Sequence, residues 1–172
     1  MRLAVNYTPT PRQRAFHDAQ EDEVLYGGAA GGGKTTAIVM DAFLRCARHP
    51  GTTAYLFRRT YRELEDTLLP EALRRIPRPL YRYMAQGHEM RLCNGSTLRF
   101  RHCQKDADRF LYQGAEIHWL YFDELTHFSR EVYEFLRSRL RARASLRVRP
   151  VVRATSNPGG PGHAWVKARF LG

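Results

Sequence analysis

The chain has 172 residues, of which 43% are hydrophobic and 26% are charged, a balance typical of one globular domain. Its 28 lysines and arginines against 17 aspartates and glutamates give a formal net charge of +11, which favours a polyanionic partner such as nucleic acid. No apolar run approaches the roughly 20 residues of a membrane span, and the N-terminus has no hydrophobic signal segment, so we expect a soluble, intracellular protein. Cys46, Cys93 and Cys103 form no disulfide framework, and their spacing to His88 and His102 matches no standard zinc pattern.

A short helix is predicted near the N-terminus, over residues 11–20. Thr10 can cap it, and Pro11 suits its first position because proline lacks the N–H group that would be unsatisfied there. Gln13 then lies in the first turn, and its amide offers one donor and one acceptor, which suits the edge of an adenine ring. By residue type alone, a solvent-facing glutamine on a packing helix is the simpler interpretation.

A glycine-rich loop lies between a predicted strand, residues 23–26, and a predicted helix, residues 35–44. It satisfies the phosphate-binding pattern G-x-x-x-x-G-K-[ST]. Glycines let backbone N–H groups turn around an anion, and the helix N-terminus adds unsatisfied N–H groups. Lys34 can reach the β- and γ-phosphates of a nucleotide, and the Thr35 hydroxyl can bind Mg²⁺. The predicted nucleotide-binding residues of this loop are Gly28, Ala29, Ala30, Gly31, Gly32, Gly33, Lys34, Thr35 and Thr36.

A second strand, residues 52–58, completes a strand–helix–strand order that predicts a parallel sheet. Arg58 closes this strand at the end where ligands bind in open α/β sheets. Residues 61–75 are helical in pattern, and Pro70 predicts a break within them.

Residues 88–102 predict a β-hairpin whose register can be tested on the sequence. A two-residue Asn-Gly turn would place the apolar residues of the two strands on opposite faces. A three-residue loop pairs Met90 with Leu98, which collects the apolar residues on one face and opposite charges on the other. We therefore expect the three-residue loop, with Gly95 in the left-handed position of a bulge.

Two adjacent carboxylates, Asp123 and Glu124, end an apolar strand that begins near residue 116. Because side chains alternate along a strand, the two groups can do different jobs. We expect Asp123 to hold Mg²⁺ through water. We expect Glu124 to orient and deprotonate the water that attacks the γ-phosphate of a nucleotide. The alternative is an acidic pair that only caps a helix.

A last strand, residues 150–155, ends in three small polar residues, Thr155, Ser156 and Asn157. If it runs parallel to the strand before the glycine-rich loop, Asn157 emerges beside the phosphates and can couple the loss of the γ-phosphate to movement. The alternative is a plain polar loop.

Arginines are frequent between residues 125 and 153. Ser129 is expected to cap a helix over residues 130–142, on which Arg130, Arg137 and Arg141 share one face. Such a face can contact phosphates in a sequence-tolerant way. A solvated helix surface is an equally weighted alternative.

The order of these motifs resembles the ATPase domain of tailed-bacteriophage terminase large subunits, the DNA-packaging motors. The likeness covers nearly the whole chain. Its last segment, residues 156–167, is the most specific, because many ATPases share a phosphate-binding loop. The segments that carry it are residues 11–13, 27–36, 56–61, 94–96, 112–116, 121–128 and 156–167.

The resemblance implies an α/β P-loop NTPase of the ASCE type, with a mostly parallel central sheet flanked by helices and one antiparallel hairpin. It implies an ATPase that uses Mg²⁺ and pulls double-stranded DNA into a procapsid in the host cytoplasm. The implied assembly is a homo-oligomeric ring at a portal, which works with a small terminase subunit and has no membrane partner.

The family's functional residues map onto matching positions. Its glutamine motif corresponds to Gln13, and its Walker A motif to residues 28–35. Its Walker B motif corresponds to Asp123 and Glu124, and its coupling motif to residues 155–157.

Rings of this type use an arginine of the neighbouring subunit to stabilise the transition state. Arg109 is the first candidate for this residue, and Arg58 is the second. No motif decides between them.

The family usually carries a C-terminal nuclease domain, which 172 residues do not include. We therefore expect one P-loop ATPase domain over residues 1–172, either a fragment truncated at its C-terminal end or a short gene product. Two alternatives to a packaging ATPase stay open. One is a helicase-like DNA ATPase, and the other is a fragment that binds nucleotide or DNA without hydrolysis.

Overall fold

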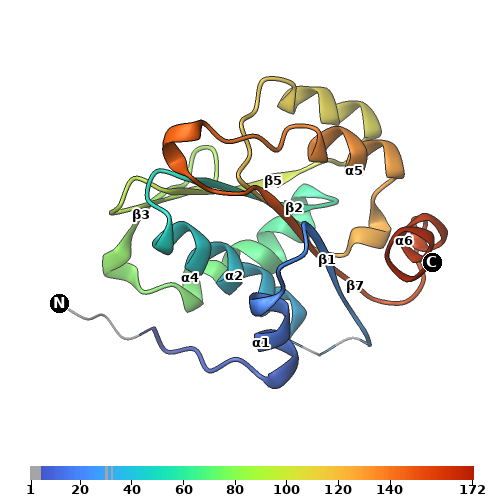
Figure 1. Cartoon of the computed structure of the whole chain (residues 1–172), viewed down its shortest axis with the longest axis horizontal. Helices are drawn as coiled ribbons and strands as arrows, with labels where there is room; N and C mark the ends of the chain where they lie inside the picture. The colour runs from blue at the N-terminus through green and yellow to red at the C-terminus, as the bar shows by residue number, and fades with distance from the viewer. Residues whose placement is uncertain (1–4, 30, 32) are drawn as a thin grey trace.

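A computed structural model describes residues 5–29, 31 and 33–172. Within this part of the chain, one seven-stranded sheet runs through the centre of the molecule (Figure 1). The strands are β1 (Glu23–Gly27), β2 (Thr53–Arg58), β3 (Tyr81–Met84), β4 (Glu89–Leu92), β5 (Thr97–His102), β6 (Trp119–Phe122) and β7 (Val151–Ser156). Their order across the sheet is β1-β7-β6-β2-β5-β4-β3.

The first five strands in this order pair in parallel, and β4 and β3 pair antiparallel. β7 therefore lies between β1, which leads into the glycine-rich loop, and β6, which leads into Asp123. Gly27 lies opposite Ser156, and Phe122 lies opposite Ala154. The carboxyl ends of the three strands therefore meet at one edge of the sheet, where ligands bind in open α/β folds. The predicted, mostly parallel α/β sheet is confirmed.

Helices cover both faces of the sheet (Figure 1). They are α1 (Pro11–Asp18), α2 (Lys34–Arg48), α3 (Tyr61–Glu63), α4 (Leu69–Arg75), α5 (Arg130–Arg137) and α6 (His163–Leu171). α1, α2 and α4 lie on one side, and α5 lies on the other (Figure 1). None of the described helices is long and apolar enough to cross a membrane.

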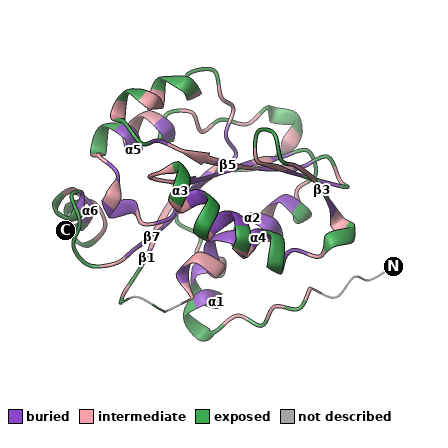
Figure 2. Cartoon of the chain, turned by 180° about the vertical axis from the view of Figure 1, so that it is seen from behind, coloured by how far each residue is buried: buried purple, intermediate pink, exposed green. Residues whose placement is uncertain are grey.

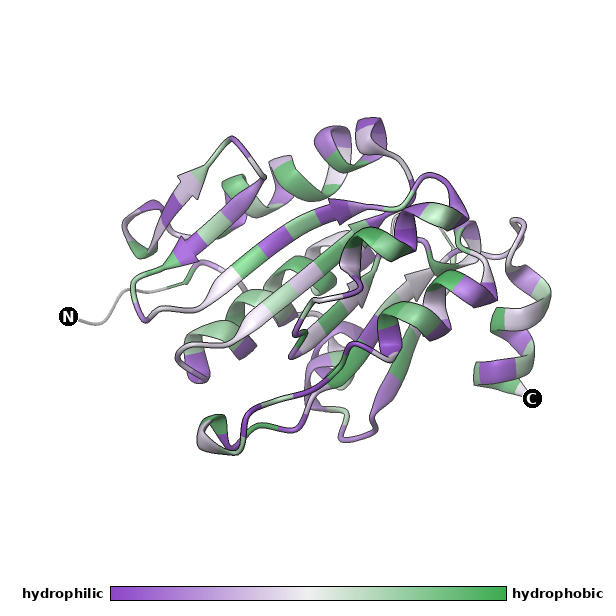
Figure 3. Cartoon of the chain, turned by 90° about the horizontal axis from the view of Figure 1, so that it is seen from above, coloured by the Kyte–Doolittle hydropathy of each residue, from purple (hydrophilic) through white to green (hydrophobic). Residues whose placement is uncertain are grey.

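The two faces of the sheet carry separate apolar clusters. Leu56 and Tyr121 pack with α2, whereas the next residues along the chain, Phe57 and Phe122, pack with α5. Successive strand side chains point to opposite faces, and both faces are covered, so β6 is apolar at every position and β2 is apolar between Thr53 and Arg58. Figure 2 shows the buried residues along the sheet, and Figure 3 shows hydrophobic segments on the strands and on the helices beside them.

The predicted hairpin register is confirmed. Met90 lies opposite Leu98, and Gly95 has a φ of +87°, the left-handed conformation that glycine adopts without a steric penalty. The sequence prediction missed β3, which adds a third antiparallel strand beside β4. Its short run follows Pro77 and Pro79 and contains the exposed Arg82, so it lacks a strong strand pattern.

The segment of residues 61–75 does not break at Pro70 as predicted. It stays helical, but residues 64–68 form a wider π-helical turn, in which the N–H group of Leu69 donates to the carbonyl of Leu64. Such turns occur frequently at functional sites. Here the turn places Asp66 and Thr67 in the wall of a pocket of about 600 Å³.

The predicted arginine face of the helix after Ser129 is wrong. Ser129 caps α5 as expected, but the helix ends at Arg137 rather than near residue 142. Arg141 therefore lies outside the helix. Arg130 and Arg137 form ion pairs with Glu134 at 3.9 and 3.4 Å, so their charges are partly satisfied within the protein.

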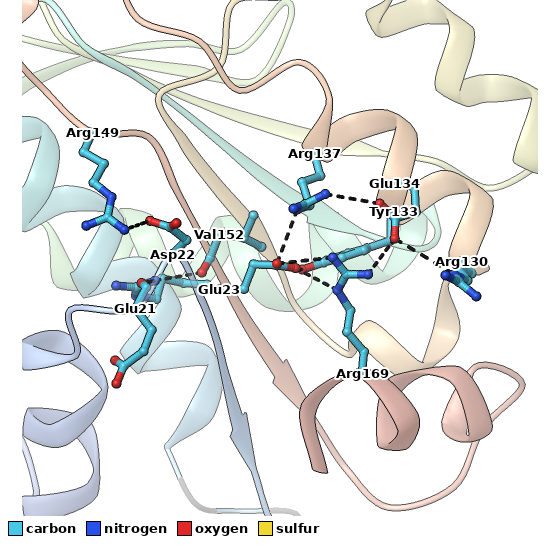
Figure 4. A network of polar contacts seen from close by, with 11 residues as sticks. Glu21, Asp22, Glu23, Arg130, Tyr133, Glu134, Arg137, Arg149, Val152 and Arg169 are labelled. Carbon is cyan, nitrogen blue, oxygen red and sulfur yellow. Dashed lines mark hydrogen bonds and ion pairs between the residues drawn. The ribbon is translucent and has the colours of Figure 1, made fainter. Parts of the chain in front are cut away.

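Glu23, the first residue of β1, is the centre of a polar network that holds α6 in place (Figure 4). Its carboxylate accepts hydrogen bonds from the Tyr133 hydroxyl and from Arg169 Nε, the latter at 2.8 Å. Arg169 Nη1 also donates to Glu134 on α5 at 2.6 Å. One arginine of α6 thus joins this helix to β1 and to α5.

The Glu23 network predicts a stability loss in acid. Burial alone would raise the pKa of Glu23, but hydrogen bonds from Arg169 and Tyr133 and the nearby arginine charges outweigh burial and lower it from 4.5. A carboxyl group whose pKa is lowered by folding stabilises the protein above its unfolded pKa and loses this effect as the pH falls through its folded pKa. Urea unfolding between about pH 5 and pH 3 should therefore show a steeper stability loss for the wild type than for Glu23→Gln. If the free energy of unfolding falls equally with pH in the two proteins, Glu23 does not have this stabilising role.

Candidate active site

A pocket of about 600 Å³ opens where the carboxyl ends of β1, β6 and β7 meet. It brings together residues that are far apart in the sequence: the glycine-rich loop, Arg58, Glu124 and Asn157. Each was predicted as a site residue or as a candidate. The lining residues from the loop and the start of α2 are Gly31, Gly33, Lys34, Thr35 and Thr36.

The loop has the backbone that anion binding requires. Gly28, Gly31 and Gly33 have φ values of +133°, +85° and +71°, which side-chain-bearing residues rarely adopt. Lys34, the first residue of α2, is buried, and its ammonium group donates to the carbonyls of Gly28 and Ala29 at 3.1 and 2.5 Å. The predicted residues Ala30 and Gly32 lie outside the described part of the chain.

Asp123 is the most enclosed acidic group of the site, with 1% of its surface exposed. Its carboxylate accepts hydrogen bonds from the hydroxyl groups of Thr35 at 3.1 Å and Thr155 at 2.6 Å. Arg58 Nη1 lies 2.5 Å from Oδ2 and supplies the compensating charge. The hydroxyl of Thr35 and the carboxylate of Asp123 are hard oxygen donors side by side, which is the donor chemistry that Mg²⁺ prefers. The predicted metal-binding pair therefore fits the ion.

Glu124 points into the same pocket and contacts the end of β7. Its φ and ψ are +58° and +62°, a left-handed conformation that a residue with a Cβ seldom adopts. The Glu124 N–H group donates to Thr155 Oγ1 at 3.2 Å, and its Oε1 accepts from Asn157 Nδ2 at 2.8 Å. The amide oxygen of Asn157 is buried and has no hydrogen-bond partner among the described residues. Ser156 Oγ donates to the Asn157 carbonyl at 2.9 Å and takes no part in the pocket wall.

The Gln13 side chain is engaged within the protein. Its Oε1 accepts from the Thr10 N–H group at 2.9 Å, which completes the cap of α1, and its Nε2 donates to the Gly33 carbonyl at 3.0 Å. The amide oxygen therefore caps α1, and the amide nitrogen links α1 to the glycine-rich loop. The contact to adenine that the resemblance implies stays a prediction, and it would use the second N–H group or the second lone pair of the amide.

A family model described as "Terminase large subunit, T4likevirus-type, N-terminal" matches residues 25–168. The chain belongs to this terminase family. No curated protein matches this terminase chain in sequence.

Solved terminase structures share the fold. The large terminase of a thermophilic bacteriophage superimposes with a TM-score of 0.78 at 15% identity, over 95% of this chain and 43% of that chain. A complex of the same phage protein with ADP gives 0.69 at 14% identity, over 94% and 42%. The large terminase ATPase domain of Thermus phage P74-26 gives 0.65 at 18% identity, over 97% and 71%. The chain thus spans less than half the length of the first of these proteins.

One wall of the pocket in this terminase domain was not predicted from the sequence. The Thr36 hydroxyl donates to Glu71 on α4 at 2.7 Å, and Arg75 holds the same carboxylate at 2.9 Å. Burial would raise the pKa of Glu71, but the hydrogen bonds from Thr36 and the arginines outweigh it and lower the pKa. The i, i+4 spacing of Glu71 and Arg75 was visible in the sequence, but it signals helix stability rather than a site.

The two arginine candidates occupy different places in the terminase domain. Arg58 lies in the pocket of its own chain, where it holds Asp123. Arg109 lies outside this pocket. Its guanidinium group donates to the Asp106 carbonyl at 2.7 Å and lies 4.3 Å from the centre of the Phe110 ring. A role for Arg109 in a neighbouring subunit stays a prediction.

A methyl group at position 33 is predicted to disrupt the join between α1 and the loop. An added Cβ at Gly33 would lie 2.6 Å from Gln13 Nε2, and left-handed backbone costs a residue with a Cβ about 1–2 kcal/mol. Gly33→Ala should therefore lower the free energy of unfolding by about that amount and weaken nucleotide binding, as measured by urea unfolding and nucleotide titration. Gly27→Ala is the matched control, because a Cβ there has no neighbour within 4 Å. Equal behaviour of the two variants would contradict the prediction.

Proposed function

We propose that this domain hydrolyses ATP with Mg²⁺ and uses the energy to move double-stranded DNA, as the ATPase part of a terminase large subunit. One observation carries the proposal: Lys34, Thr35, Asp123, Glu124 and Asn157 come from three parallel strand ends and line or adjoin one pocket. Phosphate binding, metal binding, water activation and coupling each have a suitable group there. Membership of the terminase family supports this assignment.

The residues divide the chemistry of hydrolysis among themselves. The loop N–H groups and Lys34 would bind the β- and γ-phosphates. Thr35 and Asp123 would hold Mg²⁺, which when bound neutralises charge that develops on the phosphate oxygens. Glu124 would take a proton from the attacking water, because it is the one carboxylate beside the loop without a cation paired to it in the described structure.

Asn157 supplies a coupling between the phosphates and the sheet. It holds Glu124 at 2.8 Å, and its free amide oxygen can accept a hydrogen bond from a water molecule near that carboxylate. Its strand, β7, lies between the loop strand and the strand of Asp123. A change of contacts at the γ-phosphate would therefore reach β7 through Asn157, which is how loss of a phosphate can be converted into movement.

The DNA partner is supported by the formal net charge of +11 and by the family. The ring at a portal, the small terminase subunit and the setting in the host cytoplasm are parts of the same proposal. The decisive experiment compares ATP turnover with blunt duplex DNA and with single-stranded DNA. A packaging ATPase should respond to the duplex, whereas stimulation by single strands alone would favour a helicase-like enzyme. Absence of turnover with retained nucleotide binding would favour a non-hydrolysing fragment.

A further inference from the structure

A second pocket, of about 490 Å³, lies at the opposite edge of the sheet from the candidate active site. Its lining includes Trp119 and Val151, which are the first residues of β6 and β7, and the C-terminal end of α2. α1 forms another side of it. We name this hollow the arginine pocket after six of its lining residues, Arg14, Arg45, Arg48, Arg147, Arg149 and Arg153.

The carboxylates at this pocket do not balance its arginines. Arg45 is paired with the buried Asp41 at 2.8 Å, and Arg149 is paired with Asp22 (Figure 4). The side chains of three others have no hydrogen bond or ion pair within the described chain, although they come from three different segments: Arg14, Arg48 and Arg147. These three side chains are exposed, and together with the exposed Asp18 they line one hollow, whose excess of positive charge attracts an anion.

Arg153 adds a charge at the base of the pocket. It lies on β7, where the sequence predicted the last strand, and only 1% of its surface is exposed. Its guanidinium group donates only to main-chain carbonyls, those of Ala19, Glu21 and Val152, each at 2.9 Å. Its Nε is buried and has no partner in the described structure. Burial, and then the charge of Arg45, lower the pKa of Arg153, and the charge of Asp41 offsets this effect only in part.

Helix stabilisation explains only part of this cluster. Arg45 and Arg48 lie in the last turn of α2, where cations interact favourably with the helix dipole. Arg14 and Arg147 lie outside that helix. Arg147 has a φ of +51°, a conformation that residues with a Cβ seldom adopt and that needs support from its surroundings. The dipole therefore does not account for the arginines that α1 and the loop before β7 contribute.

We propose that the arginine pocket is a binding site for phosphate groups, separate from the phosphate-binding loop. The planar guanidinium group matches the oxygens of a phosphate in a bidentate way, and several arginines around one hollow suit a chain of phosphates. The source is either the backbone of nucleic acid or a free polyphosphate. The site does not depend on ATP hydrolysis, so it would stand if the proposed function failed.

The test uses Trp119 as a reporter. Trp119 lies under the guanidinium group of Arg45, 5.5 Å from the ring centre, and it is one of only two tryptophans. In a Trp165→Phe protein, titration with inorganic tripolyphosphate should therefore change the remaining tryptophan fluorescence. A labelled blunt duplex, followed by anisotropy, forms the second arm and distinguishes nucleic acid from free polyphosphate.

The decisive comparison is between two charge-matched double variants. Arg48→Glu with Arg147→Glu should weaken binding by at least about tenfold and, for the duplex, lower the salt slope by about two, one for each lost phosphate contact. Arg82→Glu with Arg141→Glu makes the same charge change at exposed arginines outside the pocket and should have a small effect. If only the Arg48/Arg147 double variant loses binding, the site is supported. The probe whose binding is lost, tripolyphosphate or duplex, then identifies the source of the phosphates. Equal losses in both pairs, or no loss, overturn it.

Discussion

Replacing Glu124 with glutamine is expected to lower ATP turnover by about 10²–10⁴-fold while nucleotide binding persists. Glutamine keeps the length of the side chain and an oxygen that can accept the 2.8 Å hydrogen bond from Asn157, but it cannot take a proton from water. The phosphate-binding groups of the loop, Lys34 and Thr35 among them, are unchanged. Steady-state hydrolysis and titration with a fluorescent ATP analogue measure the two properties separately.

Glu131→Gln is the control for this substitution, because Glu131 is an exposed residue on α5 and lies outside the pocket. It should hydrolyse ATP at the wild-type rate. If Glu124→Gln also does so, another group activates the water and the general-base assignment is wrong. Loss of both nucleotide binding and ATP turnover would instead indicate that Glu124 maintains the structure of the segment that follows β6.

Asp123→Asn is expected to be the most destabilising change in the pocket. Asp123 is 1% exposed and pairs with Arg58 at 2.5 Å, so its neutralisation leaves this guanidinium group with only the more exposed Glu63, 3.5 Å away, as a counter-charge. Removal of one partner of a buried ion pair typically costs about 3–5 kcal/mol, and the small remaining exposure of Arg58 places the expected loss near 3 kcal/mol. Urea unfolding measures it. Turnover should also be lost, because the carboxylate that would hold Mg²⁺ is gone.

A double variant separates the two effects of Asp123. Arg58→Met in the Asp123→Asn background removes the charge that has lost its closest partner, so it should recover much of the stability but none of the turnover. If Asp123→Asn is as stable as the wild type, the pair with Arg58 contributes little to folding. If the double variant regains turnover, Asp123 is not required for hydrolysis.

Much of the pocket could be predicted from the sequence because parallel strands end at one edge of their sheet. A lysine after β1, a carboxylate pair after β6 and an asparagine after β7 must then lie close together, wherever the intervening helices pack. The hairpin register was predictable for a similar reason, since a side-chain period of two leaves one register that buries Met90 and Leu98 together.

Features that depend on distances between elements were not predictable. Gln13 reaches Gly33 only because Phe16 packs α1 into the core beside α2. Pro70 was expected to break a helix, but the wider turn before it leaves the helix continuous. Arg153 was predicted to lie in the last strand, but its burial follows only from the position of β7 between β1 and β6 in the sheet. In each case tertiary packing overrides a local rule.

α1 has only eight residues, yet it contacts the loop that lines one pocket and itself lines the other. Gln13 holds the main chain of the glycine-rich loop, and one residue further along Arg14 lines the arginine pocket. A ligand that displaces this short helix at one pocket therefore displaces a contact of the other. Thermodynamic linkage makes such an effect reciprocal: whatever factor one ligand applies to the affinity of the second, the second applies to the first. α1 is thus the place where an allosteric coupling between nucleotide and anion would be measured.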